Sequence, residues 1–277
     1  MPDQPSADLP MTSAAALLLG LLDDASLLGR SPADAADAVG THRALCEGVD
    51  AALVGPLQVR VSQLGALLDV LDAAPSSTPL VVRLVADTGL VEAAEVRAVL
   101  LDDDRVEVAG LVVVLPVDGP LGESAALTLG SLDFALPSVV EVPDAPGWAD
   151  AVAVIADDGA ERVGLRVGDR LAEMLHGAVD CGAVAALTSP LTCVVHDGTG
   201  PGVLNVIGAV AEAVDGGDVS RVAAALSERD ADRLVAIVAS ADPRRVRGRL
   251  AAVATADPAA TLAGLRDLGL LEEDDTS

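Results

Sequence analysis

The sequence predicts an α/β protein, with a (β/α)-barrel, that is, a TIM-barrel-like fold, as the first choice and an open doubly wound parallel sheet as the alternative. Short, mostly Val-rich segments without polar alternation are typical of strands buried on both faces. They alternate with helical patterns at the pace of βα units, which favours a parallel sheet. The count reaches seven or eight strands, as a barrel requires. No G-x-G-x-x-G opens a helix after the first strand, which weakens a dinucleotide-binding open sheet.

Six apolar segments bounded by Gly, Pro or Asp are the expected strands. They are Ala52–Arg60, Leu80–Ala86, Val106–Leu115, Ser138–Val142, Arg162–Val167 and Ala183–Thr188. One more strand is expected near Asp23–Leu28, and residues 249–256 form either a late strand or the end of a helix.

Helical spacing of apolar residues predicts helices between these strands, at residues 62–74, 89–104, 148–159 and 169–179. The last third is expected to be helix-rich, with consecutive helices over 203–214, 218–228, 230–240 and 242–253 and a closing helix over 257–271. Asp218, Asp230 and Asp242 are the expected N-caps. The expected organisation is a flexible tail over 1–11, one barrel-like domain over 12–270 and an acidic flexible tail over 271–277.

The chain contains no lysine and no tyrosine, and all 17 basic residues are arginines. Schiff-base and pyridoxal-phosphate chemistry need a lysine amine, and a P-loop needs its lysine. These classes are excluded, and no cofactor is expected. The scarcity of residues with AT-rich codons indicates a GC-rich bacterial genome of actinobacterial type.

The formal net charge of −26 makes nucleic acid and anionic membranes poor partners, because a polyanion repels both. The apolar run at residues 14–22 is shorter than the roughly 20 residues that span a bilayer. Three cysteines, far apart and odd in number, are typical of a reducing compartment. We therefore expect a cytoplasmic protein.

In a barrel, the functional site lies at the carboxyl ends of the strands. Arg83, Glu141, Arg166 and Thr188 belong to strands that are otherwise apolar. A buried arginine must find an anion, because leaving it unpaired is very costly. The simplest structural interpretation is Arg83 or Arg166 paired with Glu141. The functional interpretation is an arginine clamp for a ligand carboxylate or phosphate.

Asp23 and Asp24 form a second candidate, since adjacent carboxylates can share a proton or bind a metal, although such pairs more often cap helices or face solvent. Cys193 and His196 have a chelating spacing, but no second motif completes four zinc ligands, so no metal site is expected. The candidate acids and bases are Asp23, Asp24 and Glu141.

Several segments of the chain resemble an uncharacterised family of actinobacterial proteins with a TIM-barrel-like architecture. The family's D-D-A-G-L-F-P-P-A, K-L-R-T-G-G, G-V-P-F-K-A-T-A-G-L-H-H-P-V-R, H-G-F-L-N-V and L-G-L-L segments are similar to residues 23–33, 163–168, 182–196, 201–206 and 268–271. The resemblance covers most of the chain and implies the barrel fold, but no settled activity.

The departures from this family pattern are at chemically active positions. Ala186 stands where the pattern has Lys, and Thr192-Cys193 stands where it has His-His. Lys and His would carry proton transfer, covalent catalysis or metal binding. The polar residues that match the pattern are Asp23, Asp24, Arg166, Thr188 and Asn205. The resemblance therefore implies a binding site without its reaction.

Three functions follow as expectations. The first is a catalytically degenerate barrel, more a binding protein than an enzyme, that binds a small anionic ligand through Arg83, Arg166, Thr188 and Asn205, or assembles with itself or a paralogue. The second is a lyase or isomerase of a carboxylated or phosphorylated metabolite, with Glu141, Asp23 or Asp24 as acid or base and Arg166 as anion clamp. The third is a scaffold, which predicts a large exposed apolar face on the C-terminal helices.

Overall fold

A computed structural model describes residues 13–29, 32–132, 136–159 and 161–271. Its eight strands form a closed barrel in the order β1-β2-β3-β4-β5-β6-β7-β8. All neighbours are parallel, and pairing of β1 with β8 closes the sheet. The predicted barrel is therefore confirmed and the open sheet is wrong. The expected tails, 1–11 and nearly all of 271–277, fall outside the described residues.

Every expected strand is present within a few residues of its predicted limits. The strands are β1 (Leu22–Asp24), β2 (Val54–Arg60), β3 (Leu80–Val85), β4 (Val106–Val114), β5 (Ser138–Glu141), β6 (Arg162–Leu165), β7 (Ala185–Leu191) and β8 (Leu250–Thr255). The late strand is β8, which confirms that alternative. The expected helix over 242–253 is wrong beyond Arg247, because Gly248 ends it.

One helix, α1 (Ser13–Leu18), precedes β1, and each strand is followed by one or more helices. In chain order, the helices after β1 are α2 (Ala35–Glu47), α3 (Leu64–Ala73), α4 (Leu90–Leu100), α5 (Leu121–Ser131), α6 (Trp148–Asp158), α7 (Leu171–Asp180), α8 (Val203–Val214), α9 (Val219–Ser227), α10 (Ala231–Ser240), α11 (Pro243–Arg247) and α12 (Pro258–Asp267), with the short 3-10 helices η1 (Ala51–Leu53) and η2 (Val61–Gln63). The sequence patterns missed α1, α2 and α5.

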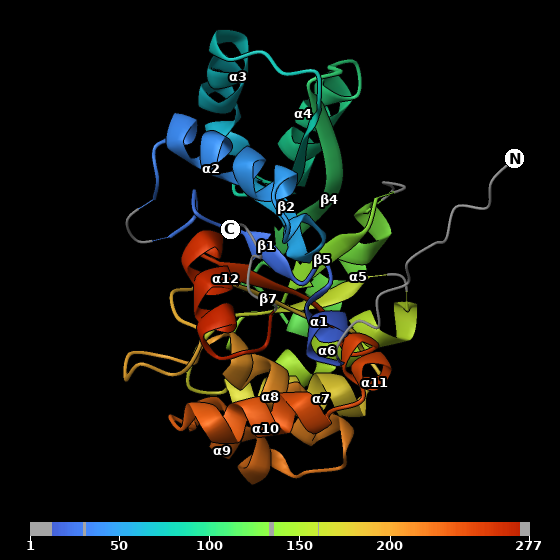
Figure 1. Ribbon diagram of the computed structural model, residues 1–277. Helices are drawn as coiled ribbons and strands as arrows, with labels where there is room; N and C mark the ends of the chain where they lie inside the picture. The colour runs from blue at the N-terminus through green and yellow to red at the C-terminus, as the bar shows by residue number, and fades with distance from the viewer. Residues whose placement is uncertain (1–12, 30–31, 133–135, 160, 272–277) are drawn as a thin grey trace, which may run out of the picture.

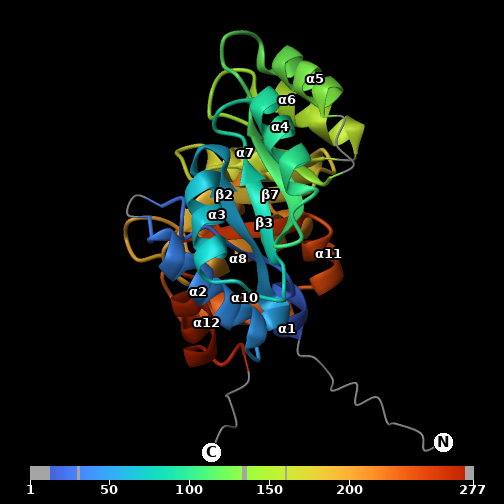
Figure 2. The same cartoon turned by 90° about the horizontal axis from the view of Figure 1, so that it is seen from above.

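The helices surround the strands unevenly (Figures 1 and 2). α2, α3 and α4 lie on one side of the barrel, and α7 to α10 lie on the opposite side (Figure 1). Four helices, α8 to α11, separate β7 from β8, which confirms the helix-rich C-terminal third. The side chains of Asp218, Asp230 and Asp242 accept hydrogen bonds from backbone N–H groups of the first turns of α9, α10 and α11, as predicted.

The main apolar core lies between the strands and the helices, whereas the barrel interior combines a small apolar cluster with polar side chains. Val112, Val139, Ala186 and Ala252 form a separate apolar cluster. Alternation along a strand puts Glu141 on the same face as Val139, and Thr188 on the same face as Ala186. Alanine and glycine inside the barrel leave volume for long polar side chains.

The surface does not match the scaffold expectation. Among the described residues, the large exposed apolar side chains include Val91, Val99 and Leu101 on or next to α4, and none lies on α8, α9 or α10. The predicted apolar face on the C-terminal helices is therefore wrong. Within the same residues, no helix combines the length and hydropathy that crossing a membrane requires.

Replacing Gly164 with alanine tests how closely β5 and β6 pack. A Cβ at Gly164 would lie 2.8 Å from the Glu141 Cα and 2.9 Å from the Val139 Cγ1. Overpacking of this kind costs about 1–3 kcal/mol of unfolding free energy, which urea unfolding followed by circular dichroism measures. The control is Gly65→Ala in α3, where a Cβ meets nothing within 4 Å; it is expected to be neutral or slightly stabilising. Equal stability of both variants would contradict the described packing.

Candidate functional site

Five of the predicted polar side chains converge inside the barrel or at the carboxyl ends of its strands. We call the carboxyl ends of the strands the barrel mouth. These side chains form two separate groups. One group joins β1, β2 and β3 through Asp23, Gln58 and Arg83. The other joins β5, β6 and β7 through Glu141, Arg166 and Thr188.

Asp23 and Arg83 form a buried ion pair. Arg83 Nη1 donates to Asp23 Oδ2, and Gln58 Nε2 donates to the same oxygen at 2.9 Å. Gly110 on β4 leaves space beside the guanidinium, since a Cβ there would lie 3.6 Å from Arg83 Nε. The structural interpretation of Arg83 therefore holds, but its partner is Asp23 and not Glu141.

The second oxygen of Asp23 lies in a different environment. Among the described residues, Asp23 Oδ1 is buried and has no hydrogen-bond partner. Burial raises the pKa of Asp23 above its usual value, although Arg83 and Gln58 act in the opposite direction. Arg162 on β6 also lies within electrostatic reach of Asp23. Asp23 is thus the anion around which the interior cations are arranged.

Glu141 is the centre of the second group. Thr188 Oγ1 donates to Glu141 Oε2 at 2.6 Å, and Arg166 Nη1 donates to Glu141 Oε1 at 3.3 Å. The Glu141 side chain is 6% exposed, whereas that of Arg166 is 64% exposed. The sequence left Arg83 and Arg166 as possible partners of Glu141, and Arg166 is the one that pairs with it. Its guanidinium reaches solvent at the barrel mouth.

Asn205 joins three segments of backbone. Its Oδ1 accepts from the His196 N–H at 2.7 Å and the Gly202 N–H at 3.0 Å. Its Nδ2 donates to the Ala225 and Glu228 carbonyls, both at 2.8 Å. An asparagine amide has two donors and two acceptor positions, so this residue is fully used within the protein. The expectation that Asn205 binds a ligand finds no free polar atom.

Asp24 does not act together with Asp23, because successive residues of a strand point to opposite faces. Its Oδ2 lies 3.0 Å from His42 Nδ1, and its Oδ1 accepts from the Ser26 N–H at 3.0 Å. His42 Nε2 lies 3.5 Å from Cys46 Sγ. Sequence reasoning missed this Asp24–His42–Cys46 cluster. The available signal was the i, i+4 spacing of His42 and Cys46, on a helix that was itself not predicted.

The remaining histidine and cysteine residues do not converge on one point. His196 Nδ1 accepts from the Gly198 N–H at 3.0 Å, and Cys193 Sγ lies 3.9 Å from the Pro201 carbonyl oxygen. His176 pairs with Asp180, one turn along α7. Within the described part of the chain, no three His, Cys, Asp or Glu side chains gather as metal ligands.

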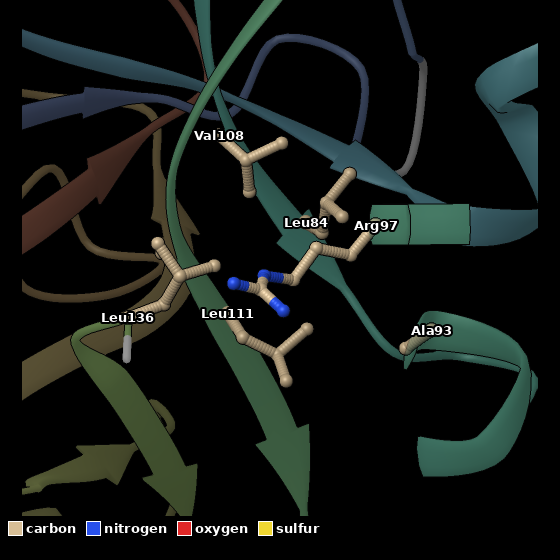
Figure 3. Close-up of a pocket in the computed structure, with 7 residues that line it drawn as sticks. Leu84, Ala93, Arg97, Val108, Leu111 and Leu136 are labelled. Atoms are coloured by element: carbon tan, nitrogen blue, oxygen red, sulfur yellow. The ribbon is translucent and has the colours of Figure 1, made fainter. Parts of the chain in front are cut away.

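A small cavity lies between α4 and strands β3 and β4, outside the barrel mouth (Figure 3). Its volume is about 10 Å³, and Leu84, Val108, Leu111 and Leu136 surround the Arg97 side chain that extends into it. That volume is room for one water molecule at most. The cavity is therefore a packing defect and not a ligand site.

Comparisons with protein-family models, curated proteins and solved structures return no match to this chain. Any assignment of function must therefore follow from the geometry of these side chains.

Substitution of Arg83 tests the interior ion pair. Arg83→Met leaves Asp23 buried without its cation, which costs about 3–5 kcal/mol of unfolding free energy at neutral pH. Asp23→Leu combined with Arg83→Met should cost clearly less, because neither member of this ion pair is then left without the other. Urea unfolding of the two single variants and the double variant gives the coupling. A double variant as unstable as the sum of the singles would contradict the pair.

The cost of Arg83→Met should also depend on pH. The folded-state pKa of Asp23 is raised, so the folded state takes up a proton before the unfolded chain does as the pH falls. Protonation removes the unpaired charge, and the loss relative to the wild type should shrink as the pH is lowered towards that raised pKa. A loss that grows on acidification would contradict a raised pKa.

Asn205→Ala is expected to destabilise the protein without changing ligand binding. It leaves buried N–H and carbonyl groups without partners, at a cost on the order of 3 kcal/mol. Ser227→Ala on α9, which removes only hydrogen bonds to exposed carbonyls of its own helix, is the control and should change stability little. If Asn205→Ala kept the unfolding free energy of the wild type, Asn205 would again be a candidate for ligand binding.

Proposed function

We propose that this protein is a (β/α)-barrel that binds a small carboxylate or phosphate anion at its mouth, and that it has binding rather than catalytic function. The observation that carries the proposal is the arrangement of Arg166. Its side chain is largely exposed, and one of its guanidinium nitrogens pairs with the buried carboxylate of Glu141. The other oxygen of that carboxylate accepts a hydrogen bond from Thr188. A guanidinium that is paired on one side presents its remaining N–H groups to solvent. The planar geometry of these donors matches a carboxylate or a phosphate.

The position of Arg166 supports the same proposal. It follows the last residue of β6, and phosphate sites of barrel enzymes lie at this end of the strands. The backbone is also held next to it, because the Val167 N–H donates to Ser189 Oγ at 3.0 Å. The large negative charge of the chain opposes binding of extended polyanions. A small anion that contacts Arg166 directly is the ligand class that this arrangement favours.

The contacts of Glu141 support binding over catalysis. Both of its oxygens already accept hydrogen bonds, from Arg166 and Thr188. A general base must reach the proton of a substrate, and the Glu141 side chain is only 6% exposed. A lyase or isomerase that uses Glu141 remains the alternative proposal, and it requires a substrate proton to reach one of the carboxylate lone pairs that Arg166 and Thr188 leave unused.

The test is stabilisation of the protein by inorganic phosphate, with malonate as the carboxylate probe, at low ionic strength. A site with a Kd of about 0.1 mM would gain about 2.7 kcal/mol of stability at about 10 mM ligand. We expect the thermal midpoint of the wild type to rise with ligand. We expect Arg166→Ala to weaken binding about tenfold or more, because it removes charged hydrogen bonds.

Arg221→Ala on α9 is the matched control, since Arg221 has a 60% exposed side chain paired with Glu212 outside the barrel mouth. It should bind phosphate as the wild type does. Equal weakening by both substitutions would mean that phosphate responds only to net charge, and no stabilisation of the wild type by either anion would refute the proposal. Turnover of a carboxylated metabolite that Glu141→Gln abolishes would favour the lyase or isomerase.

A further inference from the structure

Asp24, His42 and Cys46 form a chain of three side chains that the anion site does not use. Asp24 Oδ2 and His42 Nδ1 are 3.0 Å apart, and His42 Nε2 and Cys46 Sγ are 3.5 Å apart. A thiol next to one imidazole nitrogen, with a carboxylate on the other, is the arrangement of an activated cysteine nucleophile. Its three members are the orienting acid, the base and the nucleophile, in that order.

The fold holds this cluster between the barrel and the outer helices. Asp24 ends β1 on the face that points away from Asp23, and its second oxygen is held by the Ser26 N–H. His42 and Cys46 lie one turn apart on α2, so they share one side of that helix. His42 is 2% exposed and Asp24 is 1% exposed, whereas Cys46 is exposed. The base is thus shielded from water and the nucleophile is accessible.

The electrostatics of His42 favour its protonated form. Burial by itself lowers the pKa of His42, but the hydrogen bonds to Asp24 and Cys46 and the charges of the same two groups raise it to about 9. The imidazolium thus places a proton donor next to the Cys46 Sγ. The carbonyl end of α2 and the neighbouring Glu47 act against negative charge at this position. His42 is therefore the positive group in contact with the Cys46 Sγ.

We propose that Cys46 is a peroxide-reactive cysteine, activated by His42 and oriented through Asp24, and that it constitutes a second functional site independent of the barrel mouth. The thiolate sulfur attacks one oxygen of a hydroperoxide. The S–O bond forms as the O–O bond breaks, so the sulfur is oxidised by two electrons and the peroxide is reduced. The leaving oxide takes the proton of the His42 imidazolium, and the products are a sulfenic acid, water or an alcohol, and neutral His42.

Oxidation fits this cluster better than acyl transfer does. Acyl transfer requires hydrogen-bond donors aimed at the developing oxyanion, whereas attack on a hydroperoxide requires a thiolate, a proton donor and access. Cys46 supplies the accessible sulfur, and His42 supplies the proton donor. The substrate class is accordingly a small hydroperoxide that reaches an exposed helix side.

The other two cysteines of the chain provide internal standards. Cys181 is exposed at the end of α7 and has no imidazole contact among the described residues. Cys193 is partly buried, and burial together with the nearby Asp197 raises the pKa of its thiol. At equal solvent access, Cys46 should therefore react faster than Cys181, and Cys193 should react slowest.

The first measurement is alkylation of the full chain by iodoacetamide at pH 6.5, with the three cysteines resolved by peptide mass spectrometry. An ordinary thiol is about 1% thiolate at that pH. We expect Cys46 to react about tenfold or more faster than Cys181. His42→Gln should bring Cys46 to the rate of Cys181, and Asp24→Asn should give an intermediate rate. A slow Cys46 in the wild type, or a fast one in His42→Gln, would overturn the proposal.

Unfolding in the variants is detected within the same experiment. Loss of structure exposes Cys193 and accelerates its alkylation, whereas loss of activation alone changes only Cys46. If His42→Gln speeds up the alkylation of Cys193, that variant has lost structure. The Asp24→Asn variant is then used instead, at a temperature at which the wild type is folded. The role of the cluster would then be refuted if Asp24→Asn left the alkylation rate of Cys46 unchanged while Cys193 still reacted slowly.

The second measurement is treatment of the wild type with hydrogen peroxide in the presence of dimedone, which captures sulfenic acids. We expect the adduct on Cys46, a loss of it in His42→Gln, and no comparable adduct on Cys181. Fast alkylation without a dimedone adduct would overturn the assignment to hydroperoxides. Phosphate binding by Arg166 should be the same in Cys46→Ser as in the wild type, which separates this site from the barrel mouth.

Discussion

The rest of the structure depends on the two buried carboxylates of β1, the shortest strand of the barrel. β1 has three residues, closes the sheet between β8 and β2, and contains two adjacent buried carboxylates. Because neighbouring residues of a strand face opposite sides, Asp23 enters the barrel and Asp24 enters the helix layer. Each carboxylate needs a cation or donors in its own compartment. Arg83 and Gln58 supply them inside the barrel, and His42 supplies them outside.

This division explains why the protein has two separate clusters of polar side chains. The barrel interior holds paired charges whose surroundings are small side chains, so long residues such as Arg83 cross to their partners. Nearer the mouth, Glu141 and Thr188 anchor Arg166, which is left facing solvent. On the other side of β1, the carboxylate of Asp24 contacts His42, which contacts the exposed thiol of Cys46. The proposed binding at the mouth and the proposed reactivity of Cys46 therefore do not share side chains.

Much of the fold follows from local patterns, whereas the site depends on pairings between distant segments. Most βα units were predicted from an apolar strand followed by helical spacing, and Asp218, Asp230 and Asp242 were predicted as caps. α2 and α5 were missed because their apolar spacing is weak and their burial comes from tertiary packing. Because α2 was missed, the Asp24–His42–Cys46 cluster was missed as well, since α2 brings His42 and Cys46 to Asp24. Asn205 is the single asparagine of the chain, and its amide joins backbone segments within the protein.

By itself, the sequence determined the barrel class, the exclusion of lysine and tyrosine chemistry, and the need of each buried arginine for an anion. These properties follow from composition, from period-2 and helical patterns, and from the cost of burying charge. Only the tertiary structure decided which anion each cation meets. Arg83 reaches Asp23 across β2, and Arg166 reaches Glu141 across one strand pair. Such pairings depend on strand register and on which way each side chain faces, and both become defined only when the eight strands close into a barrel.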